Sequence, residues 1–296
     1  MHIVAQMDER ELSRRLLTCE LAHVNSQNYY GQTPLFCAAI YGNEFIVREL
    51  ANRNDLGANL EDHKGRTALS IAAWHGHECI VRALLRRKDI DLKKRDIYGY
   101  CALLKAAVQG HCGVVKLLLR HHDVILDVNN NDDRSPLIWA AVQGHHDILH
   151  ILMETKAAQV DLKDRFHRTA LSYAAMQGHV DVVRTLLDCG EVEADSIDES
   201  GRAPLSWAAG KGHHDLVRLL VERKDVPADL KDNHQRIALL YAALCGHSHV
   251  VRTLLKRDDV EPDFKDSDGR TPAFWASAQG NMSVVALLKK EAVRDT

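Results

Sequence analysis

The sequence predicts an all-α solenoid, a stack of short helix-turn-helix pairs joined by hairpin loops. Eight glycines recur every 34 residues, and a segment with helical periodicity lies on each side of every glycine. A helix pair of this size cannot bury its own apolar face, so neighbouring pairs must stack to build one continuous core. The glycines are Gly42, Gly76, Gly110, Gly144, Gly178, Gly212, Gly246 and Gly280.

The phrase before each glycine predicts the first, inner helix of a repeat. In residues 67–73, Thr67 is suited to cap the helix because its hydroxyl can accept an amide hydrogen bond. Where proline follows the cap, as at Pro34, its preset φ starts the helix without wasting an amide. The Ala-Ala pair allows neighbouring helices to approach closely. The glycine is expected to end the helix in a left-handed turn, which a residue with a Cβ adopts at an energetic cost.

The phrase after each glycine predicts the second, outer helix. Ile80, Ala83 and Leu84 stand at i, i+3 and i+4, which gives one apolar stripe. Leu186 and Leu220 belong to the same stripe and are predicted to be buried. The opposite face carries a basic residue in six repeats and is predicted to face solvent. Its members are Arg48, Arg82, Lys116, Arg184, Arg218 and Arg252.

The register divides the chain into one uninterrupted array, with no linker and no second domain expected. Residues 1–27 are interpreted as an N-terminal capping half-repeat, because the segment fits only an outer helix. The predicted repeats 1 to 7 are 28–61, 62–95, 96–129, 130–163, 164–197, 198–231 and 232–265, and 266–296 holds repeat 8 with a polar C-terminal cap.

The repeated phrase resembles one known family. D-x-x-G-x-T-P-L-x-x-A-A-x-x-G-H followed by V-V-x-x-L-L is similar to the ankyrin repeat, and the resemblance covers about residues 28–289. The short inner helix does not fit the tetratricopeptide repeat, which shares the 34-residue period. The usual ankyrin period is shorter by one residue, and the extra residue falls in the long connection, as at 87–94. The segment G-R-x-P-L-S-W-A-A at 201–209 looks like the variant found in long fungal ankyrin arrays.

The resemblance implies a non-catalytic scaffold that binds another protein or peptide through its concave face and hairpin tips. With a net charge of −3 and no long basic run, nucleic acid is not expected as a partner. No apolar stretch is long enough for a membrane span, and residues 1–15 contain no apolar segment of a secretory signal. Seven cysteines without a CxxC pair predict buried, reduced thiols. We therefore expect a monomer in the cytoplasm, with the nucleus as the alternative.

Three ladders of equivalent positions are predicted to line the concave face. The hairpin positions are interpreted as partner contacts or as arginines bonded locally to a hairpin Asp such as Asp62, Asp164 or Asp232. The inner-helix positions are interpreted as rings that stack between repeats or as hot spots for a partner. Lys105 breaks that ladder and is expected to snorkel or to pair with an anionic partner group. The candidate contacts are Arg66, Tyr100, Arg134, Arg168 and Arg202 in the hairpins, Lys105, Trp139 and Tyr173 on the inner helices, and His75, Gln109, Gln143, Gln177 and Lys211 before the glycines.

The histidines do not predict a metal site, and no cofactor is expected. The resemblance implies that the histidine after each repeat glycine forms a hydrogen bond between adjacent repeats; these are His77, His111, His145, His179, His213 and His247. His146 and His150 share one helical face, but no third ligand is evident, so we interpret them as surface residues. One alternative function remains: a small-molecule site or enzyme in the groove around Lys105, Trp139 and Tyr173, which a deep pocket with convergent polar groups would favour.

Overall fold

The computed structural model describes residues 23–122, 128–155 and 159–292. Residues 1–22, which make up most of the predicted N-terminal cap, lie outside this part of the chain. By its contacts the chain divides into two units, Met1–Ala140 with Ile151–Ala158, and Ala141–His150 with Gln159–Thr296. The boundary between them passes through the helices of repeat 4.

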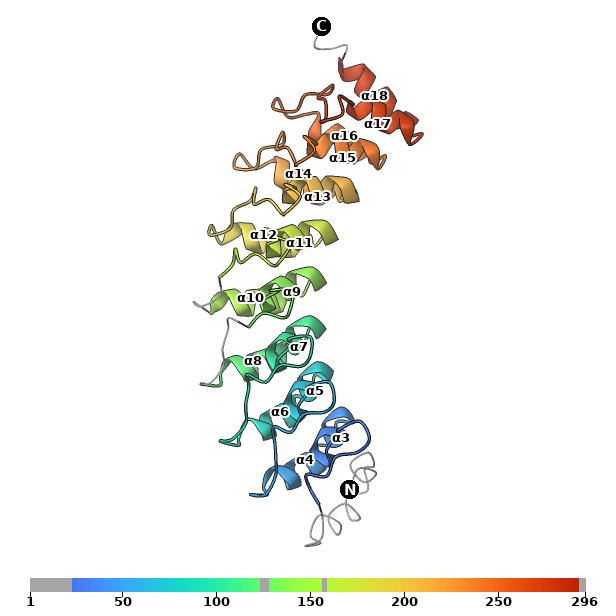
Figure 1. Cartoon of the computed structure of the whole chain (residues 1–296). Helices are drawn as coiled ribbons and strands as arrows, with labels where there is room; N and C mark the ends of the chain where they lie inside the picture. Colours follow the sequence, from blue (N-terminus) through green and yellow to red (C-terminus); the bar gives the residue numbers. More distant parts are fainter. Residues whose placement is uncertain (1–22, 123–127, 156–158, 293–296) are drawn as a thin grey trace. The chain divides into compact units, whose positions relative to one another are not determined.

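The first unit contains three complete helix pairs. The inner helices α3, α5 and α7 pack against one another in one layer, and the outer helices α4, α6 and α8 form the second layer (Figure 1). Their bounds are α3 Pro34–Ile40, α4 Glu44–Ala51, α5 Ala68–His75, α6 Glu78–Leu84, α7 Ala102–Gln109 and α8 Cys112–Leu119.

The second unit repeats the arrangement with four pairs. Its helices are α11 Ala170–Gln177, α12 Val180–Asp188, α13 Pro204–Lys211, α14 His214–Val221, α15 Ala238–Leu244, α16 Ser248–Leu254, α17 Pro272–Ala278 and α18 Met282–Ala292. Repeat 4 contributes α9 Pro136–Gln143 and α10 His146–Glu154. The described residues thus form sixteen helices and no strand, which confirms the predicted all-α class. Among these helices, none combines the length and the apolar character that crossing a bilayer requires.

The inner helices begin and end where the sequence predicts. The Oγ1 of Thr67 accepts the Ser70 amide at 3.2 Å, and the Ser70 hydroxyl accepts the Thr67 amide at 3.0 Å, so that two otherwise unpaired amides are satisfied. Gly76 ends α5 at φ 74°, in the left-handed region. The same pairing of a polar cap and a left-handed glycine recurs in α11, with Thr169 and Gly178.

The core follows the predicted apolar stripes. Leu186 and Leu220 are fully buried, as are the paired alanines Ala72 and Ala73, where the inner helices approach closely. The predicted basic face is solvent-exposed at all six positions: Arg48, Arg82, Lys116, Arg184, Arg218 and Arg252. The hydrophobic effect therefore holds the two layers together, and the charged side chains of the outer helices contribute little to it.

Histidine joins five of the described repeats to the repeat before them. Nε2 of His111 lies 2.9 Å from the carbonyl oxygen of Trp74, and since a carbonyl can only accept, this nitrogen carries the proton. The imidazole rests on Gly76, where an added Cβ would come within 2.5 Å of the ring. The glycine is therefore required twice, for its positive φ and for this close approach.

The predicted structural role of these histidines is confirmed at five of the six positions. The other four described joints have the same geometry: His77 to Ile40 at 3.3 Å, His179 to Val142 at 3.2 Å, His213 to Met176 at 3.1 Å and His247 to Gly210 at 3.1 Å.

The cysteines are less buried than predicted. Cys37 and Cys101 are buried, and burial raises the pKa of both thiols. The prediction is wrong for Cys79 and Cys245, which are exposed because they stand on the solvent side of α6 and after the last turn of α15. All six cysteines in the described residues are free thiols.

Candidate binding face

The hairpins that precede the inner helices are organised by a buried carboxylate. Oδ1 of Asp62 accepts the amides of Lys64 and Arg66, each at 2.9 Å, and thereby closes the hairpin. The amide of Ile97 then bonds to the carbonyl of Lys64 at 3.0 Å, which links the hairpins of repeats 2 and 3. In each unit the hairpins and the exposed ends of the inner helices form a surface, and we call this surface of a unit its binding face.

In five of the repeats, the second oxygen of the hairpin aspartate accepts a hydrogen bond from the side chain nine residues further along. Nζ of Lys105 donates to Asp96 at 2.6 Å, and the hydroxyl of Tyr173 donates to Asp164 at the same distance. The other donors are Trp207 to Asp198 at 3.0 Å, Trp275 to Asp266 at 2.8 Å, and Tyr241 to Asp232. In these five repeats the ladder side chain is thus a hydrogen-bond donor that is bonded to the hairpin of its own repeat.

Stacking of the ladder rings between repeats is mediated by arginine. The guanidinium carbon of Arg202 lies 3.5 Å from the ring centroid of Trp207 and 3.9 Å from that of Tyr241, so the cation lies between the two rings. A planar cation on an aromatic face is favourable, most of all when it is desolvated. Burial lowers the pKa of Arg202, which is consistent with a partly desolvated cation.

The expected local bond from arginine to the hairpin carboxylate forms in repeat 2. Nε and Nη2 of Arg66 donate to Oδ2 of Asp62 at 2.8 and 2.5 Å. In repeat 5, Arg168 instead reaches Asp198 of the next repeat, with its Nε at 3.3 Å, and lies 4.9 Å from the centroid of Trp207. The expectation of a purely local bond is corrected here. Oδ2 of Asp164 accepts from the hydroxyl of Tyr173, so Arg168 turns toward the following repeat.

Lys105 takes neither of its expected roles. Its side chain is buried, and its ammonium group is bonded to Asp96 within its own repeat. The lysine does not snorkel because a carboxylate lies within its reach, and a buried ammonium group needs such a partner.

Repeat 4 departs from the pattern because Asn130 stands where most repeats have aspartate. The indole Nε1 of Trp139 is buried and has no hydrogen-bond partner in the described residues. Asn130 directs its Nδ2 to the hydroxyl of Tyr100 at 3.3 Å, and the ring of Tyr100 lies 5.8 Å from that of Trp139. Arg134 covers the other part of the indole at 5.2 Å from its centroid.

The predicted residues before the repeat glycines are all exposed. They are His75, Gln109, Gln143, Gln177 and Lys211. Partial burial lowers the pKa of His75, and the neighbouring His77 and His111 lower it further. These five side chains are available to a partner, whereas the hairpin and ladder residues form a bonded layer beneath the surface.

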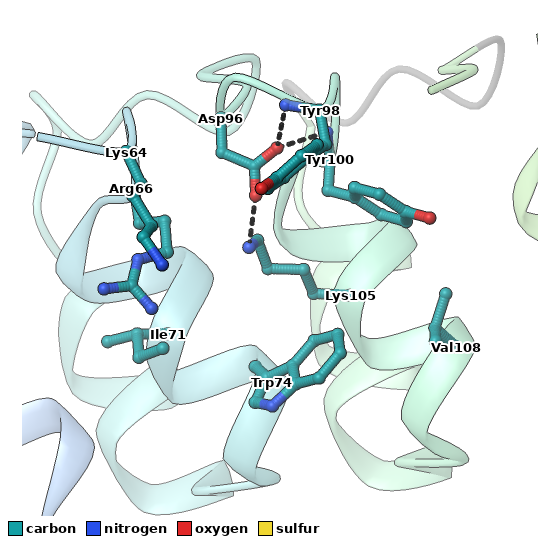
Figure 2. Close-up of a pocket in the computed structure, with 9 residues that line it drawn as sticks. All are labelled: Lys64, Arg66, Ile71, Trp74, Asp96, Tyr98, Tyr100, Lys105 and Val108. Atoms are coloured by element: carbon teal, nitrogen blue, oxygen red, sulfur yellow. Dashed lines mark hydrogen bonds and ion pairs between the residues drawn. The ribbon is translucent and has the colours of Figure 1, made fainter. Parts of the chain in front are cut away.

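A pocket of about 270 Å³ opens on the binding face between repeats 2 and 3. It brings together three predicted residues, Arg66, Tyr100 and Lys105 (Figure 2). The sequence prediction missed Trp74 and Tyr98, which also line it. One signal could have found Trp74: it is the only aromatic residue at its position in the eight repeats. The pocket's lining residues all belong to the first unit, and Tyr173 is not among them.

Left-handed glycines, histidine joints and carboxylate-closed hairpins define a helical repeat protein that displays side chains from a fixed backbone. The family model for ankyrin repeats, in its three-copy form, matches residues 1–96, 89–164, 156–232 and 224–295. Because these matches together extend over nearly the whole chain, the chain belongs to the ankyrin repeat family. A search of curated proteins gives no match.

Proposed function

We propose that the chain is a non-catalytic interaction module that binds a protein or peptide through the binding face. Ankyrin repeats are in general protein interaction modules, which supports the class of function. The observation that carries the proposal is the exposure of large apolar side chains at the hairpin tips. Tyr29, Ile97 and Tyr98 are 87%, 56% and 59% exposed. Large apolar side chains that are exposed at hairpin tips indicate an interaction surface, and tyrosine is enriched at binding hot spots.

The rigidity of the face also favours binding over catalysis. The hairpin carboxylates hold the backbone beneath the exposed side chains, so that little conformational entropy is lost when a partner is bound. We assign the partner contacts to the exposed tips and to the exposed ends of the inner helices, including Gln109, Gln177 and Lys211. The packed arginines and rings support these contacts from below.

One observation favours a second candidate, a small-molecule site, because a pocket is present at Lys105. Its volume of about 270 Å³ falls below the roughly 300–1,000 Å³ of small-molecule sites. Its titratable pair, Asp96 and Lys105, is internally bonded at 2.6 Å. These properties suit a single side chain from a partner better than a whole substrate.

The proposal is tested with a partner captured from the native source and three substitutions on the binding face. Tyr98→Ser, Gln109→Arg and Gln177→Arg change exposed side chains, so we expect an unchanged melting temperature and at least a tenfold loss of affinity by calorimetry. Arg168 is unsuitable for this purpose because its ion pair with Asp198 contributes to the fold.

The matched control changes the outer helices. Arg184→Gln and Arg218→Gln alter exposed side chains on the other layer and should leave the affinity unchanged. If the outer substitutions abolish binding and the inner ones do not, the assigned face is wrong. If capture fails but a metabolite binds and Trp74→Ala removes it, the small-molecule candidate replaces the proposal.

A further inference from the structure

The space between successive inner helices is filled differently along the array. Between repeats 6 and 7, two rings face each other and the guanidinium group of Arg202 fills the gap between them. Between repeats 2 and 3 the two ladder positions hold Ile71 and Lys105 in place of rings. Arg66, the counterpart of Arg202, turns away to Asp62 and lies over the ring of Phe36 at 5.4 Å. The pocket of about 270 Å³ is the space that ring, arginine and ring occupy elsewhere.

The walls of this pocket are aromatic and aliphatic. Trp74 stands at a position where no other repeat has an aromatic residue, and Tyr98 and Tyr100 line the pocket from the neighbouring hairpin (Figure 2). The ammonium group of Lys105 lies 5.7 Å from the centroid of Trp74 and 6.0 Å from that of Tyr100. A flat ring that enters the pocket would therefore meet ring edges, an apolar surface at Ile71 and a cation, all of which favour an aromatic guest.

The charges at the pocket favour an anion. Oδ1 of Asp96 accepts the amides of Tyr98 and Tyr100 at 3.0 and 2.9 Å, and Oδ2 accepts from Lys105, so the charge of this carboxylate is already balanced within the pocket. Arg66 is balanced by Asp62. Lys64 lies exposed at the rim and has no ion pair within the described residues. The three cations Lys64, Arg66 and Lys105 outnumber the two carboxylates of Asp62 and Asp96. One net positive charge therefore remains at the mouth of the pocket.

We propose that this pocket binds an aromatic side chain presented by an acidic peptide segment of a protein partner. The inference rests on the proposed function and specifies its partner. A peptide fits better than a free ligand, because the volume suits one side chain and the unpaired cation lies outside the cavity, where the flanking residues of a peptide would pass. Complementary charge at a rim raises the association rate and disfavours basic partners.

The probe is the peptide acetyl-Glu-Glu-Phe-Glu-Glu-amide, titrated into the full chain. Binding is followed by the indole N–H signals in nitrogen-15 NMR spectra, where Trp74 reports on the pocket and Trp207 serves as an internal control. We expect a saturable shift at Trp74 and none at Trp207. Peptides with alanine in place of phenylalanine, or lysine in place of glutamate, should bind at least tenfold more weakly.

Two variants locate the binding. Ile71→Tyr with Lys105→Trp rebuilds the ladder of repeats 5 and 6, and the new indole can donate to Asp96 as Trp207 does to Asp198. It should fill the pocket and reduce binding at least tenfold. Lys64→Glu changes only an exposed charge and should weaken binding severalfold. If the double variant does not fold, Lys64→Glu alone tests whether peptide binding depends on this pocket.

The inference is overturned if the peptide produces no saturable shift, if the alanine peptide binds within twofold of the probe, or if the filled pocket binds as well as the native one. The two proposals fail separately. Suppose that the captured partner no longer binds the Gln109 and Gln177 variants but still binds the variant with the filled pocket. The proposed function then stands, and the pocket is refuted as the site that the partner uses. If the peptide shifts Trp74 but the captured partner is lost only from the Arg184→Gln and Arg218→Gln variants, the pocket is supported and the proposed function is refuted.

Discussion

Replacing Asn130 by aspartate should stabilise the first unit. The indole N–H of Trp139 is buried without a partner in the described residues, and a buried unsatisfied donor costs about 1–3 kcal/mol. In repeats 6 and 8 the equivalent indoles of Trp207 and Trp275 donate to aspartate at 3.0 and 2.8 Å. Asn130→Asp offers Trp139 the same acceptor.

Little is lost by the change. Oδ1 of Asn130 accepts the amides of Asp132 and Arg134 at 3.1 and 3.0 Å, and a carboxylate keeps both bonds and strengthens them. The bond to the hydroxyl of Tyr100 is long, at 3.3 Å, and can reverse because a hydroxyl also donates. We therefore expect a gain of about 1–2 kcal/mol in the free energy of unfolding, at the lower end because Asp132 adds a like charge nearby.

The assay is urea unfolding followed by circular dichroism, together with hydrogen exchange at the amides of Asp132 and Arg134. Exchange is included because repeat arrays can unfold in parts. The decisive control is the same substitution in a Trp139→Phe background, where the double-mutant cycle should remove the gain. A neutral or destabilising Asn130→Asp, or an equal gain without the indole, would refute the reasoning.

Two further predictions concern the second unit. Leu186→Ala should lower the free energy of unfolding by about 2–5 kcal/mol because it leaves a cavity in a fully buried stripe, whereas Arg184→Ala should change it by less than about 0.5 kcal/mol; denaturant melts check both, and equal effects would mean that the stripe is misassigned. Burial, with the bond to Asp232, raises the pKa of Tyr241 to about 12. Since the folded state holds this proton more tightly, its contribution to stability should be complete below about pH 10 and be lost as the pH rises through about 12. Absorbance titration should show a late phenol that Tyr241→Phe removes, and a high-pH titration that this substitution leaves unchanged would contradict the assignment.

The fold could be predicted because its determinants are local and periodic. A cap such as Thr67, a left-handed Gly76 and an apolar stripe ending in Leu84 each act within one repeat, and the period multiplies the signal. Stacking then follows from the need to cover the exposed apolar face. The exposure of Cys79 was missed because cysteine is usually buried, although the equivalent positions Asp147, Asp181 and Asp215 already indicated a solvent-facing site.

The binding face was harder to predict because its residues choose between competing partners. Arg66 and Arg202 occupy the same position, yet one bonds to its hairpin carboxylate and the other lies between two rings. The outcome depends on whether the ladder side chain competes for the carboxylate, as Trp207 does and Ile71 cannot. The pocket beside Ile71 is harder still to predict, because it arises from the absence of aromatic rings at the ladder positions of repeats 2 and 3.

The aspartate that closes six of the eight hairpins also separates the support of the backbone from the choice of the side chain that is displayed. One oxygen satisfies the backbone, and the other accepts any donor that arrives nine residues later, whether the ammonium group of Lys105, the phenol of Tyr173 or the indole of Trp207. These three groups differ in charge, size and polarity, yet each is held by the same acceptor. A single substitution at this position can therefore change the chemistry of the face without disturbing the hairpin. For an engineer, six repeats offer this acceptor, and libraries restricted to hydrogen-bond donors at the position nine residues later should yield new recognition surfaces on an unchanged backbone.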